Sequence, residues 1–359
     1  MRPLTSDSIR NITPYSPGKP VEELERELGI TGSIKLASNE NPLGPSPKAI
    51  AAIGGQLAKL NRYPDGAGFY LKQALSNKFN WPPEGIILGN GSNEILEIIV
   101  RTFLLPDEEA IYAEPSFVVY KLASQAAGRT GVAVPLKEGR HDLAAMADRI
   151  NEKTKLIFVA NPNNPTGTMN TAAEMDALMA RVPEDVIVVV DEAYHEYAAG
   201  PDYPDTMRCL QDGRNVIALR TFSKIYGLAG LRIGYGFAPP ALNGFMDRVR
   251  QPFNTNSLAQ AAALAALGDD EHVKESVRVN EEGKKYLYRE LGRIGVKFLP
   301  TRANFIYMEM GRDAGEVYAA LLKEGVIVRP MGPRQIRVTI GLTRENERFI
   351  GALERAIGL

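Results

Sequence analysis

The chain has 359 residues, which is more than one hydrophobic core usually supports, so we expect two domains. Its 44% hydrophobic and 24% charged residues are typical of a globular protein, and a net charge of −1 excludes a global basic field for nucleic acid or anionic membranes. The single cysteine, Cys209, excludes an intrachain disulfide, and the three histidines lack metal-ligand spacing. Since no long apolar run occurs, we expect a cytoplasmic protein without metal, nucleic-acid or membrane partners.

Residues 1–30 are expected to form an N-terminal arm with a short helix, VEELERELG at 21–29, which ends at Gly29. Seven apolar segments then alternate with helical stretches. We predict strands in GIILGN (85–90), EAIYAE (109–114), GVAVPL (131–136), KLIFVAN (155–161), DVIVVVD (185–191), NVIALRT (215–221) and RIGYGFA (232–238). Because these runs are apolar on both faces, they favour an α/β fold with a mostly parallel sheet flanked by helices.

The pattern changes after Pro252. A long helical stretch at 257–293 precedes the predicted strands VKFLP, NFIYMEM and IRVTI, and helices near 313–324 and 343–357 are interleaved with them. This alternation indicates a smaller α+β domain. We therefore expect a large domain over 31–250 and a small C-terminal domain over 251–359.

Four segments at strand ends of the large domain carry candidate functional residues, because ligands of open α/β sheets gather at the carboxyl ends of strands. The first is GNGSNEIL at 89–96, where Gly91 permits close backbone approach and the amides of Ser92 and Asn93 can bind an anion at a helix start. A glycine turn into a helix is, however, structural more often than functional. It is no dinucleotide fingerprint either, because Glu94 stands where the third glycine belongs.

Two further segments present polar side chains on turns. In NPNNPTG (161–167) two prolines stiffen a turn that would hold the amide of Asn164 rigidly, although an asparagine capping its own turn is an equal alternative. In VVVDEAYHEY (188–197) Asp191 ends an apolar strand and Tyr194 follows one turn later. Asp191 either caps the next turn or faces a ligand.

The fourth segment is TFSKIYGLAGLRIGY at 221–235. Lys224 follows a strand, Thr221 and Ser223 offer hydroxyls, and Arg232 offers a planar fork that matches a phosphate. Taken alone, Lys224 is more often a surface lysine. Together, the four segments bring an amine, a carboxylate, a rigid amide and a phosphate-binding set to one sheet edge. This combination suits a flat heteroaromatic cofactor that bears a phosphate.

The combination of NNPTG, DEAY, TFSK and the Lys-to-Arg spacing of eight resembles the fold-type-I pyridoxal 5′-phosphate enzymes, the aspartate aminotransferase superfamily. The resemblance covers most of the chain. It implies that Lys224 forms a Schiff base with the cofactor and later moves the substrate α-proton, and that Asp191 keeps the pyridine nitrogen protonated.

The same resemblance implies further cofactor contacts. Asn164 and Tyr194 would hydrogen-bond the ring hydroxyl, and Phe117 in EPSFVVY would stack on the ring where many relatives have tyrosine. The cofactor phosphate would be held by Gly91, Ser92, Asn93, Thr221, Ser223 and Arg232.

A narrower resemblance is to the histidinol-phosphate aminotransferase family, through PYSPGKP (14–20), LASNENPLGPSP (36–47), RYPDG (62–66), PFNTNSLAQ (252–260) and RVTIG (337–341). It implies transamination between histidinol phosphate and 2-oxoglutarate, with Arg337 clamping the carboxylate of glutamate. The implied remaining substrate-binding residues are Tyr15, Asn39, Tyr63 and Arg329. Tyr63 would reach the site of a neighbouring subunit, which implies a homodimer.

Other functions share parts of this pattern. Aromatic amino-acid aminotransferases and threonine-phosphate decarboxylases have similar motifs, and the former accept a ring of similar size. A ligand-sensing regulator would need a helix-turn-helix domain, for which the roughly 30 residues before the core are too few. A nicotinamide-dependent oxidoreductase would need GxGxxG after the first strand, which the sequence lacks.

Overall fold

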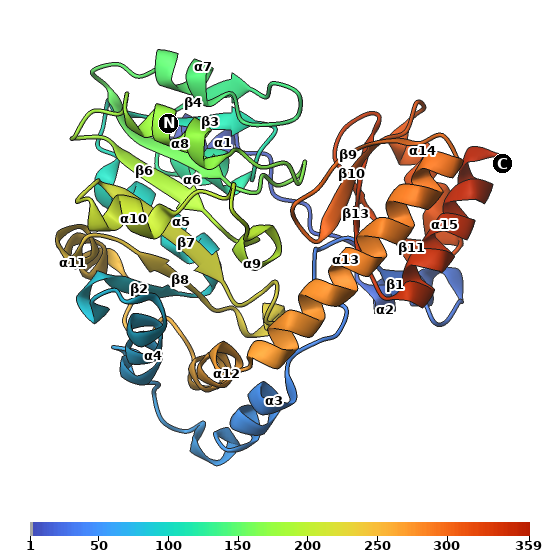
Figure 1. Cartoon of the computed structure of the whole chain (residues 1–359), viewed down its shortest axis with the longest axis horizontal. Helices are drawn as coiled ribbons and strands as arrows, with labels where there is room; N and C mark the ends of the chain where they lie inside the picture. The colour runs from blue at the N-terminus through green and yellow to red at the C-terminus, as the bar shows by residue number, and fades with distance from the viewer. Residues whose placement is uncertain (1–2) are drawn as a thin grey trace.

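The computed structural model describes residues 3–359 and folds them into two lobes of unequal size. In Figure 1 the larger lobe lies on the left and the smaller lobe, drawn in orange and red, lies on the right. Helix α13 (Asp270–Arg293) runs diagonally from the larger lobe into the smaller one. Within residues 3–359, none of the helices combines the length and apolarity that a membrane crossing requires.

The larger lobe is built on a seven-stranded sheet with the spatial order β2-β8-β7-β6-β5-β3-β4. The neighbouring pairs from β7 to β4 are parallel, whereas β8 runs antiparallel to both β2 and β7. The strands are β2 (Ile86–Gly89), β3 (Glu109–Glu114), β4 (Thr130–Pro135), β5 (Thr154–Ala160), β6 (Ile187–Asp191), β7 (Val216–Thr221) and β8 (Gly234–Phe237). Each of the seven predicted strand segments is thus a strand of this sheet, and the predicted α/β class is confirmed.

Strand β6 shows why these runs are apolar throughout. Val188 and Val190 pack into the core on one face of the sheet, and Ile187 and Val189 pack into the core on the other face. Helices α5, α6 and α11 cover the second face, and α3, α4, α7, α8, α10 and α12 contribute to the first. These helices are α3 (Pro47–Gly54), α4 (Phe69–Phe79), α5 (Gly91–Phe103), α6 (Val119–Ala126), α7 (Leu143–Asp148), α8 (Ala172–Met179), α10 (Thr206–Gln211), α11 (Pro240–Val249) and α12 (Ser257–Leu267).

The smaller lobe holds an antiparallel sheet with the order β12-β13-β10-β9. Its strands are β9 (Lys297–Leu299), β10 (Phe305–Glu309), β12 (Arg329–Pro330) and β13 (Gln335–Thr339). Helices α13, α14 (Ala314–Lys323) and α15 (Thr343–Ile357) pack on it around Leu287, Leu321 and Phe349. The predicted strands and helices of this region are confirmed. The predicted helical stretch 257–293 is two helices, because the chain leaves α12 at Gly268 and begins α13 at Asp270.

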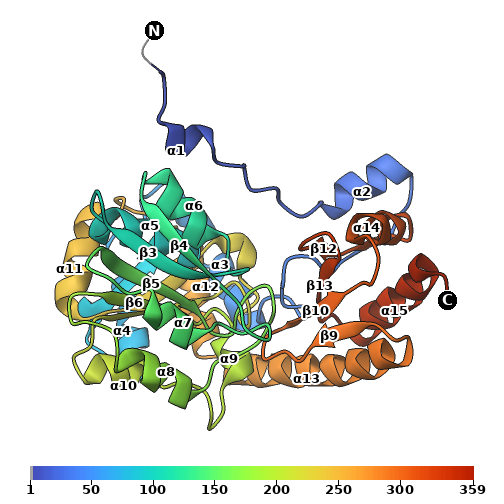
Figure 2. The same ribbon diagram turned by 90° about the horizontal axis from the view of Figure 1, so that it is seen from above.

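The N-terminal arm joins the two lobes. Figure 2 shows it passing from α1 (Asp7–Arg10), above α6, across to α2 (Val21–Leu28), beside α14. Helix α1 caps itself through the Ser6 hydroxyl and is held to the larger lobe by Gln125, which donates to the Ser8 carbonyl at 3.2 Å. Helix α2 ends at Gly29, which has a left-handed φ of 65°, as predicted. Residues 1–2 of the predicted arm lie outside the described residues.

The expected domain boundary near residue 250 stays a prediction, and two packing contacts are relevant to it. Strand β1 (Ile34–Lys35) pairs in parallel with β11 (Val326–Ile327) of the smaller lobe. Helix α12 instead packs into the core of the larger lobe through Ala259, Ala262 and Ala263. The packing therefore groups the α2–β1 segment with the smaller lobe and α12 with the larger one. The remaining short elements are α9 (His195–Ala198), η1 (Leu57–Lys59), η2 (Pro83–Gly85) and η3 (Ala229–Leu231).

Candidate active site

A cavity of about 260 Å³ lies at the carboxyl ends of β5, β6 and β7. It is lined by Tyr15, Gly91, Ser92, Asn93, Phe117, Tyr120, Ala160, Pro162, Asn164, Asp191, Ala193, Tyr194, Thr221, Ser223, Lys224 and Arg232. All eleven residues that the sequence predicted to contact the cofactor are in this set. Within residues 3–359, no group of three or more His, Cys, Asp or Glu side chains could hold a metal ion.

The start of helix α5 forms one wall of the cavity. Gly91 has a φ of 75°, and a Cβ atom built there would lie 2.5 Å from a guanidinium nitrogen of Arg232. A larger residue at position 91 would therefore displace Arg232 from the helix start. The amides of Ser92 and Asn93 belong to the first turn, where backbone N–H groups lack partners within the helix and the helix dipole is positive. The wall is therefore suited to an anion.

Arg232 and two hydroxyl groups face the same wall. Within the described residues, the Arg232 guanidinium makes one hydrogen bond, to the Ala229 carbonyl at 3.3 Å, and no ion pair. Its remaining donors are free for a ligand. Thr221 and Ser223 line the cavity beside it, and the Thr221 hydroxyl accepts from the Ser223 amide at 3.1 Å. Two hydroxyls, a guanidinium and helix-start amides together suit the oxygen atoms of a phosphate.

Asp191 ends strand β6 and is 5% exposed. The Tyr120 hydroxyl donates to its Oδ2 at 2.8 Å, and the Ala193 amide donates to its Oδ1 at 3.2 Å. Burial raises the pKa of Asp191 to about 6, against the Tyr120 hydrogen bond, which lowers the pKa. The carboxylate is therefore ionised at neutral pH, and it is oriented to pair with a cationic group in the cavity.

Tyr120 is a residue of the site that sequence reasoning missed. It lies in the first turn of α6, three residues after Phe117, which precedes the helix, and the centroids of the two rings are 5.7 Å apart, edge to face. Tyr120 also stacks on Phe158 at 4.9 Å. Its place three residues after Phe117, in the same segment EPSFVVY, is the signal that could have identified Tyr120. The pair supplies an aromatic wall and a hydrogen bond to Asp191.

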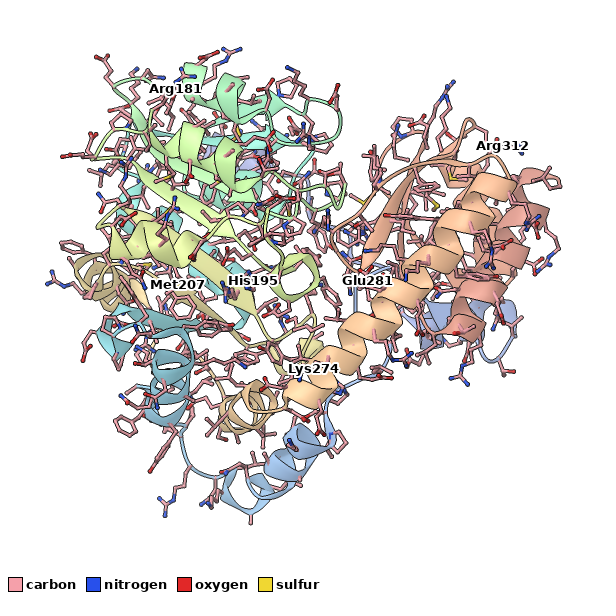
Figure 3. All side chains as sticks on the ribbon, viewed as in Figure 1. Arg181, His195, Met207, Lys274, Glu281 and Arg312 are labelled. Atoms are coloured by element: carbon pink, nitrogen blue, oxygen red, sulfur yellow. The ribbon has the colours of Figure 1, made fainter. Side chains whose placement is uncertain are left out.

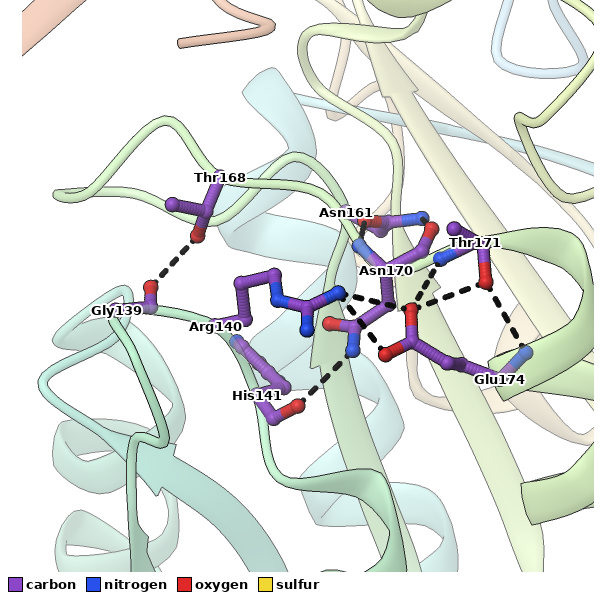
Figure 4. A network of polar contacts seen from close by, with 8 residues as sticks. All are labelled: Gly139, Arg140, His141, Asn161, Thr168, Asn170, Thr171 and Glu174. Atoms are coloured by element: carbon purple, nitrogen blue, oxygen red, sulfur yellow. Dashed lines mark hydrogen bonds and ion pairs between the residues drawn. The ribbon is translucent and has the colours of Figure 1, made fainter. Parts of the chain in front are cut away.

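The NPNNPTG turn is held in place by a network of hydrogen bonds and an ion pair, which Figure 4 shows. The residues in the network are Gly139, Arg140, His141, Asn161, Thr168, Asn170, Thr171 and Glu174. The Asn161 side chain pairs with the backbone of Asn170, donating at 3.0 Å and accepting at 2.8 Å. The Thr168 hydroxyl donates to the Gly139 carbonyl at 2.6 Å. Since both ends of the turn are fixed, Asn164 at its tip is held in the cavity wall.

Tyr194 and Asn39 form a buried pair. The Asn39 side-chain amide donates to the Tyr194 hydroxyl at 2.9 Å, and the Asn39 backbone amide donates to the Thr339 hydroxyl at 2.9 Å. Burial raises the pKa of Tyr194 to about 12, against the charge of Arg337, so its hydroxyl keeps its proton. Asn39 therefore reaches the site through Tyr194 and is not itself among the lining residues.

Lys224 is the only lysine among the lining residues. Its Nζ donates to the Ser38 carbonyl at 3.1 Å and lies 5.7 Å from the centroid of the Tyr194 ring. Burial and the nearby charge of Arg337 together lower the pKa of Lys224 to about 8. A substantial share of this amine is therefore neutral at physiological pH, which is the state a nucleophile or a general base requires.

Arg337 lies on β13 in the smaller lobe and reaches toward the cavity. It donates to Asn164 Oδ1 at 2.5 Å and to the Ala37 carbonyl at 2.8 Å. Its Nε is buried and has no hydrogen-bond partner among the described residues. Burial lowers the pKa of Arg337, and within residues 3–359 no carboxylate pairs with its guanidinium. Such an arginine is suited to an anionic ligand that enters beside Asn164.

The other predicted substrate residues lie in two places. Tyr15 lines the cavity, and the Arg329 guanidinium lies 5.3 Å from the centroid of its ring while donating to the Ser16 carbonyl at 2.7 Å. Tyr63 is not part of this cavity: it is 82% exposed and stacks on Phe253 at 4.8 Å. The chain by itself therefore brings Tyr15 and Arg329 to the cavity region and leaves Tyr63 on the surface.

Comparison with known proteins identifies the family of the chain. A model of the family described as aminotransferase class I and II matches residues 31–353. The chain belongs to this aminotransferase family. The match includes every residue lining the cavity except Tyr15.

Individual relatives match over nearly the whole chain. The histidinol-phosphate aminotransferase of Moorella thermoacetica is 49% identical over 99% of this chain and 93% of its own length. Histidinol-phosphate aminotransferase 1 of Nitrosococcus oceani is also 49% identical, over 99% of this chain and 97% of its own. A crystal structure of the Sinorhizobium meliloti histidinol-phosphate aminotransferase in complex with pyridoxal 5′-phosphate has a TM-score of 0.90 and 29% identity, covering 100% of this chain and 98% of that one.

Proposed function

We propose that the protein is a pyridoxal 5′-phosphate-dependent aminotransferase that transfers the amino group between histidinol phosphate and 2-oxoglutarate. The observation that carries this proposal is the meeting of Lys224, Asp191 and Arg232 in one cavity at the strand ends. The relatives that are 49% identical over almost the full chain are named for the same activity. The cofactor and the reaction predicted from the sequence thus agree with the family and with the residues that line the cavity.

The cavity residues fit this cofactor group by group. The amides of Ser92 and Asn93, together with Arg232 and the two neighbouring hydroxyls, would hold its phosphate. Asp191 would pair with the ring nitrogen, and the Phe117 ring would stack on the cofactor ring. When bound, pyridoxal 5′-phosphate supplies an electron sink for the charge left on the substrate Cα after proton removal.

The remaining polar residues would contact the other substituents of the cofactor ring. Asn164 and Tyr194 would hydrogen-bond its hydroxyl group, and Tyr194 can donate because it keeps its proton. Asn39 supports that role by holding the Tyr194 oxygen in place. Lys224 would attach the cofactor covalently through its amine.

The chain's own residues move the protons of the reaction. Asp191 is largely ionised at neutral pH, so it would hold a proton on the ring nitrogen of the bound cofactor. Lys224, once its amine is released, would be the base that takes the proton from the substrate Cα and the acid that gives it back during amino transfer. Its pKa of about 8 lies close to working pH, which favours transfer in both directions.

Substrate recognition is proposed to use two anion sites. Arg337 would hold the carboxylate of glutamate, because its fork matches a carboxylate and it has no acidic partner within the described residues. Tyr15 and Arg329 would meet the phosphate of histidinol phosphate at the cavity mouth. Tyr63 would complete that site from a second copy of the chain.

A homodimer is supported by the surface around Tyr63. Large apolar side chains are exposed there in a stretch of about twenty residues, more than a solvated surface favours. The residues are Ile50, Leu57, Leu60, Tyr63, Phe69 and Tyr70, with Phe253 stacked on Tyr63. The expected cytoplasmic location rests on the sequence and stays a prediction.

The half-reactions test the proposed substrate. Purified protein loaded with the cofactor is mixed with histidinol phosphate, phenylalanine or threonine phosphate under single-turnover conditions, and the visible spectrum is followed. We expect histidinol phosphate to convert the cofactor fastest, and glutamate to appear when 2-oxoglutarate is added. A faster reaction with phenylalanine would favour an aromatic amino-acid aminotransferase, and release of CO₂ from threonine phosphate would favour a decarboxylase.

A further inference from the structure

A buried ion pair lies beneath the strand ends that carry the site. Arg220 Nε donates to Glu192 Oε2 at 2.9 Å, and the two side chains are 5% and 1% exposed. Each residue is the chain neighbour of a lining residue, since Glu192 follows Asp191 and Arg220 precedes Thr221. Because side chains alternate along a strand, the pair lies on the face opposite the cavity. It is adjacent to α9 and α10, whose residues His195 and Met207 are labelled in Figure 3.

The pair is connected to the neighbouring elements by further polar contacts. Glu192 Oε1 accepts from the Thr206 hydroxyl at 2.7 Å, and the Tyr203 hydroxyl, 3.4 Å from the same oxygen, donates to the Asn161 carbonyl at 2.5 Å. Asn161 begins the turn that carries Asn164. The network therefore links the end of β5 to the end of β6.

Arg220 extends the network to the other side. Its guanidinium lies 4.9 Å from the centroid of the Phe79 ring and 5.9 Å from that of Phe237 on β8. The backbone adds a direct link, because the Glu192 amide donates to the Leu219 carbonyl at 2.8 Å. One ion pair thus connects β6, β7 and β8 just below Asp191 and Lys224.

Stability alone is a poor reason for such a pair. Burial of two charges carries a desolvation penalty, and replacing a buried ion pair with apolar side chains is often neutral or stabilising. Burial raises the pKa of Glu192, but the charge and hydrogen bond of Arg220, the charge of His195 and the Thr206 hydrogen bond together outweigh it, so the pKa lies below its usual value and the carboxylate stays ionised. A charged pair with fixed geometry, in contrast, sets the distance and angle between the strands that bear it.

We propose that the Arg220–Glu192 pair is a positioning unit for the active site. It holds the ends of β5, β6 and β7 in register, so that Asn164, Asp191 and Lys224 converge on one bound cofactor. Neither charged residue lines the cavity, so the pair acts through its neighbours. This inference rests on the proposed function and adds to it two residues that bind neither cofactor nor substrate.

The test compares a double variant with the wild type. Glu192→Gln combined with Arg220→Met removes both charges, while the methionine keeps packing on Phe79. We expect the melting temperature of the cofactor-free double variant to stay close to wild type, because no unpaired charge is left. We expect its dissociation constant for pyridoxal 5′-phosphate to rise about tenfold or more, as for loss of other supporting contacts around a bound group. Its half-reaction rate constant should fall, with little change in the substrate concentration for half-saturation.

The outcomes separate positioning from stability. If the double variant has a cofactor affinity and a rate within about twofold of wild type, as well as a wild-type melting temperature, the pair does not position the site and the inference is overturned. Arg220→Lys is the second variant in case the double variant does not fold. It keeps the charge but loses the fork, so wild-type cofactor affinity in a folded Arg220→Lys would equally overturn the inference.

A matched control is the exposed pair of Arg208 and Asp176, which links α10 to α8 at 2.9 Å nearby. Asp176→Asn should leave cofactor affinity and rate unchanged, since exposed pairs contribute little. Failure of the proposed function would be seen in the wild type, as absence of cofactor binding or of amino transfer. Failure of the inference would be seen only as wild-type behaviour of the variants.

Discussion

Lys224 should capture pyridoxal 5′-phosphate at a rate that follows the titration of its own amine, because the neutral amine is the nucleophile. Burial and the charge of Arg337 lower its pKa to about 8 from the ordinary 10.5. At pH 7.5 an amine with the lower pKa is roughly one-quarter neutral, against roughly one part in a thousand for the ordinary one. Capture near neutral pH should therefore be roughly 200-fold faster than an exposed lysine would allow.

The assay mixes cofactor-free protein with pyridoxal 5′-phosphate and follows the growth of the visible absorption band at pH values from about 7 to 10. The rate should rise with pH and level off above a midpoint near 8. A rate that still rises tenfold per unit at about pH 9.5 would refute the reasoning, because the amine would then titrate as an exposed one. Arg337→Leu should move the midpoint upward, since it removes a neighbouring positive charge. Lys121→Ala, which removes an exposed lysine, is the matched control.

Asp191→Asn should lower turnover roughly a hundredfold or more, because it removes the charge that holds the ring proton, and steady-state kinetics measure the loss. Tyr120→Phe should weaken cofactor binding about tenfold, because it removes a hydrogen bond to the charged carboxylate of Asp191. Equilibrium titration of the cofactor-free variant with pyridoxal 5′-phosphate measures the affinity, and an unchanged affinity would contradict the prediction. Arg337→Lys should slow the glutamate half-reaction while leaving the cofactor spectrum unchanged, because it keeps the charge and loses the fork. Tyr63→Phe should instead weaken histidinol phosphate, and a variant that weakens neither substrate would favour the aromatic amino-acid alternative.

The sequence was sufficient to predict the sheet and the residues that line the cavity, since both depend on local patterns. A strand such as β6 is apolar on both faces because both faces are buried, and this is visible in the run Val186–Val190. The motif residues follow strands directly, so the carboxyl edge of the sheet brings them together once the strands are known. Lys224 and Asp191 could be predicted on that basis.

Contacts between distant segments could not be predicted in this way. The pairing of Asn39 with Tyr194 joins residues 155 positions apart, and the bond from Arg337 to Asn164 joins residues 173 apart. Neither contact has a local signature, because each depends on how the smaller lobe packs against the larger one. Tyr120 is different, since it stands three residues after Phe117 in the same segment and its ring contacts that of Phe117.

The attachment of the cofactor to Lys224 is the central claim, and borohydride trapping tests it most directly. The purified holoprotein is reduced, digested and mapped by mass spectrometry. The visible band should disappear on reduction, and the cofactor mass should be found on the peptide that contains Lys224. A Lys224→Ala variant processed in parallel should carry no label. A label on another lysine of the wild-type protein, or none at all, would contradict the account.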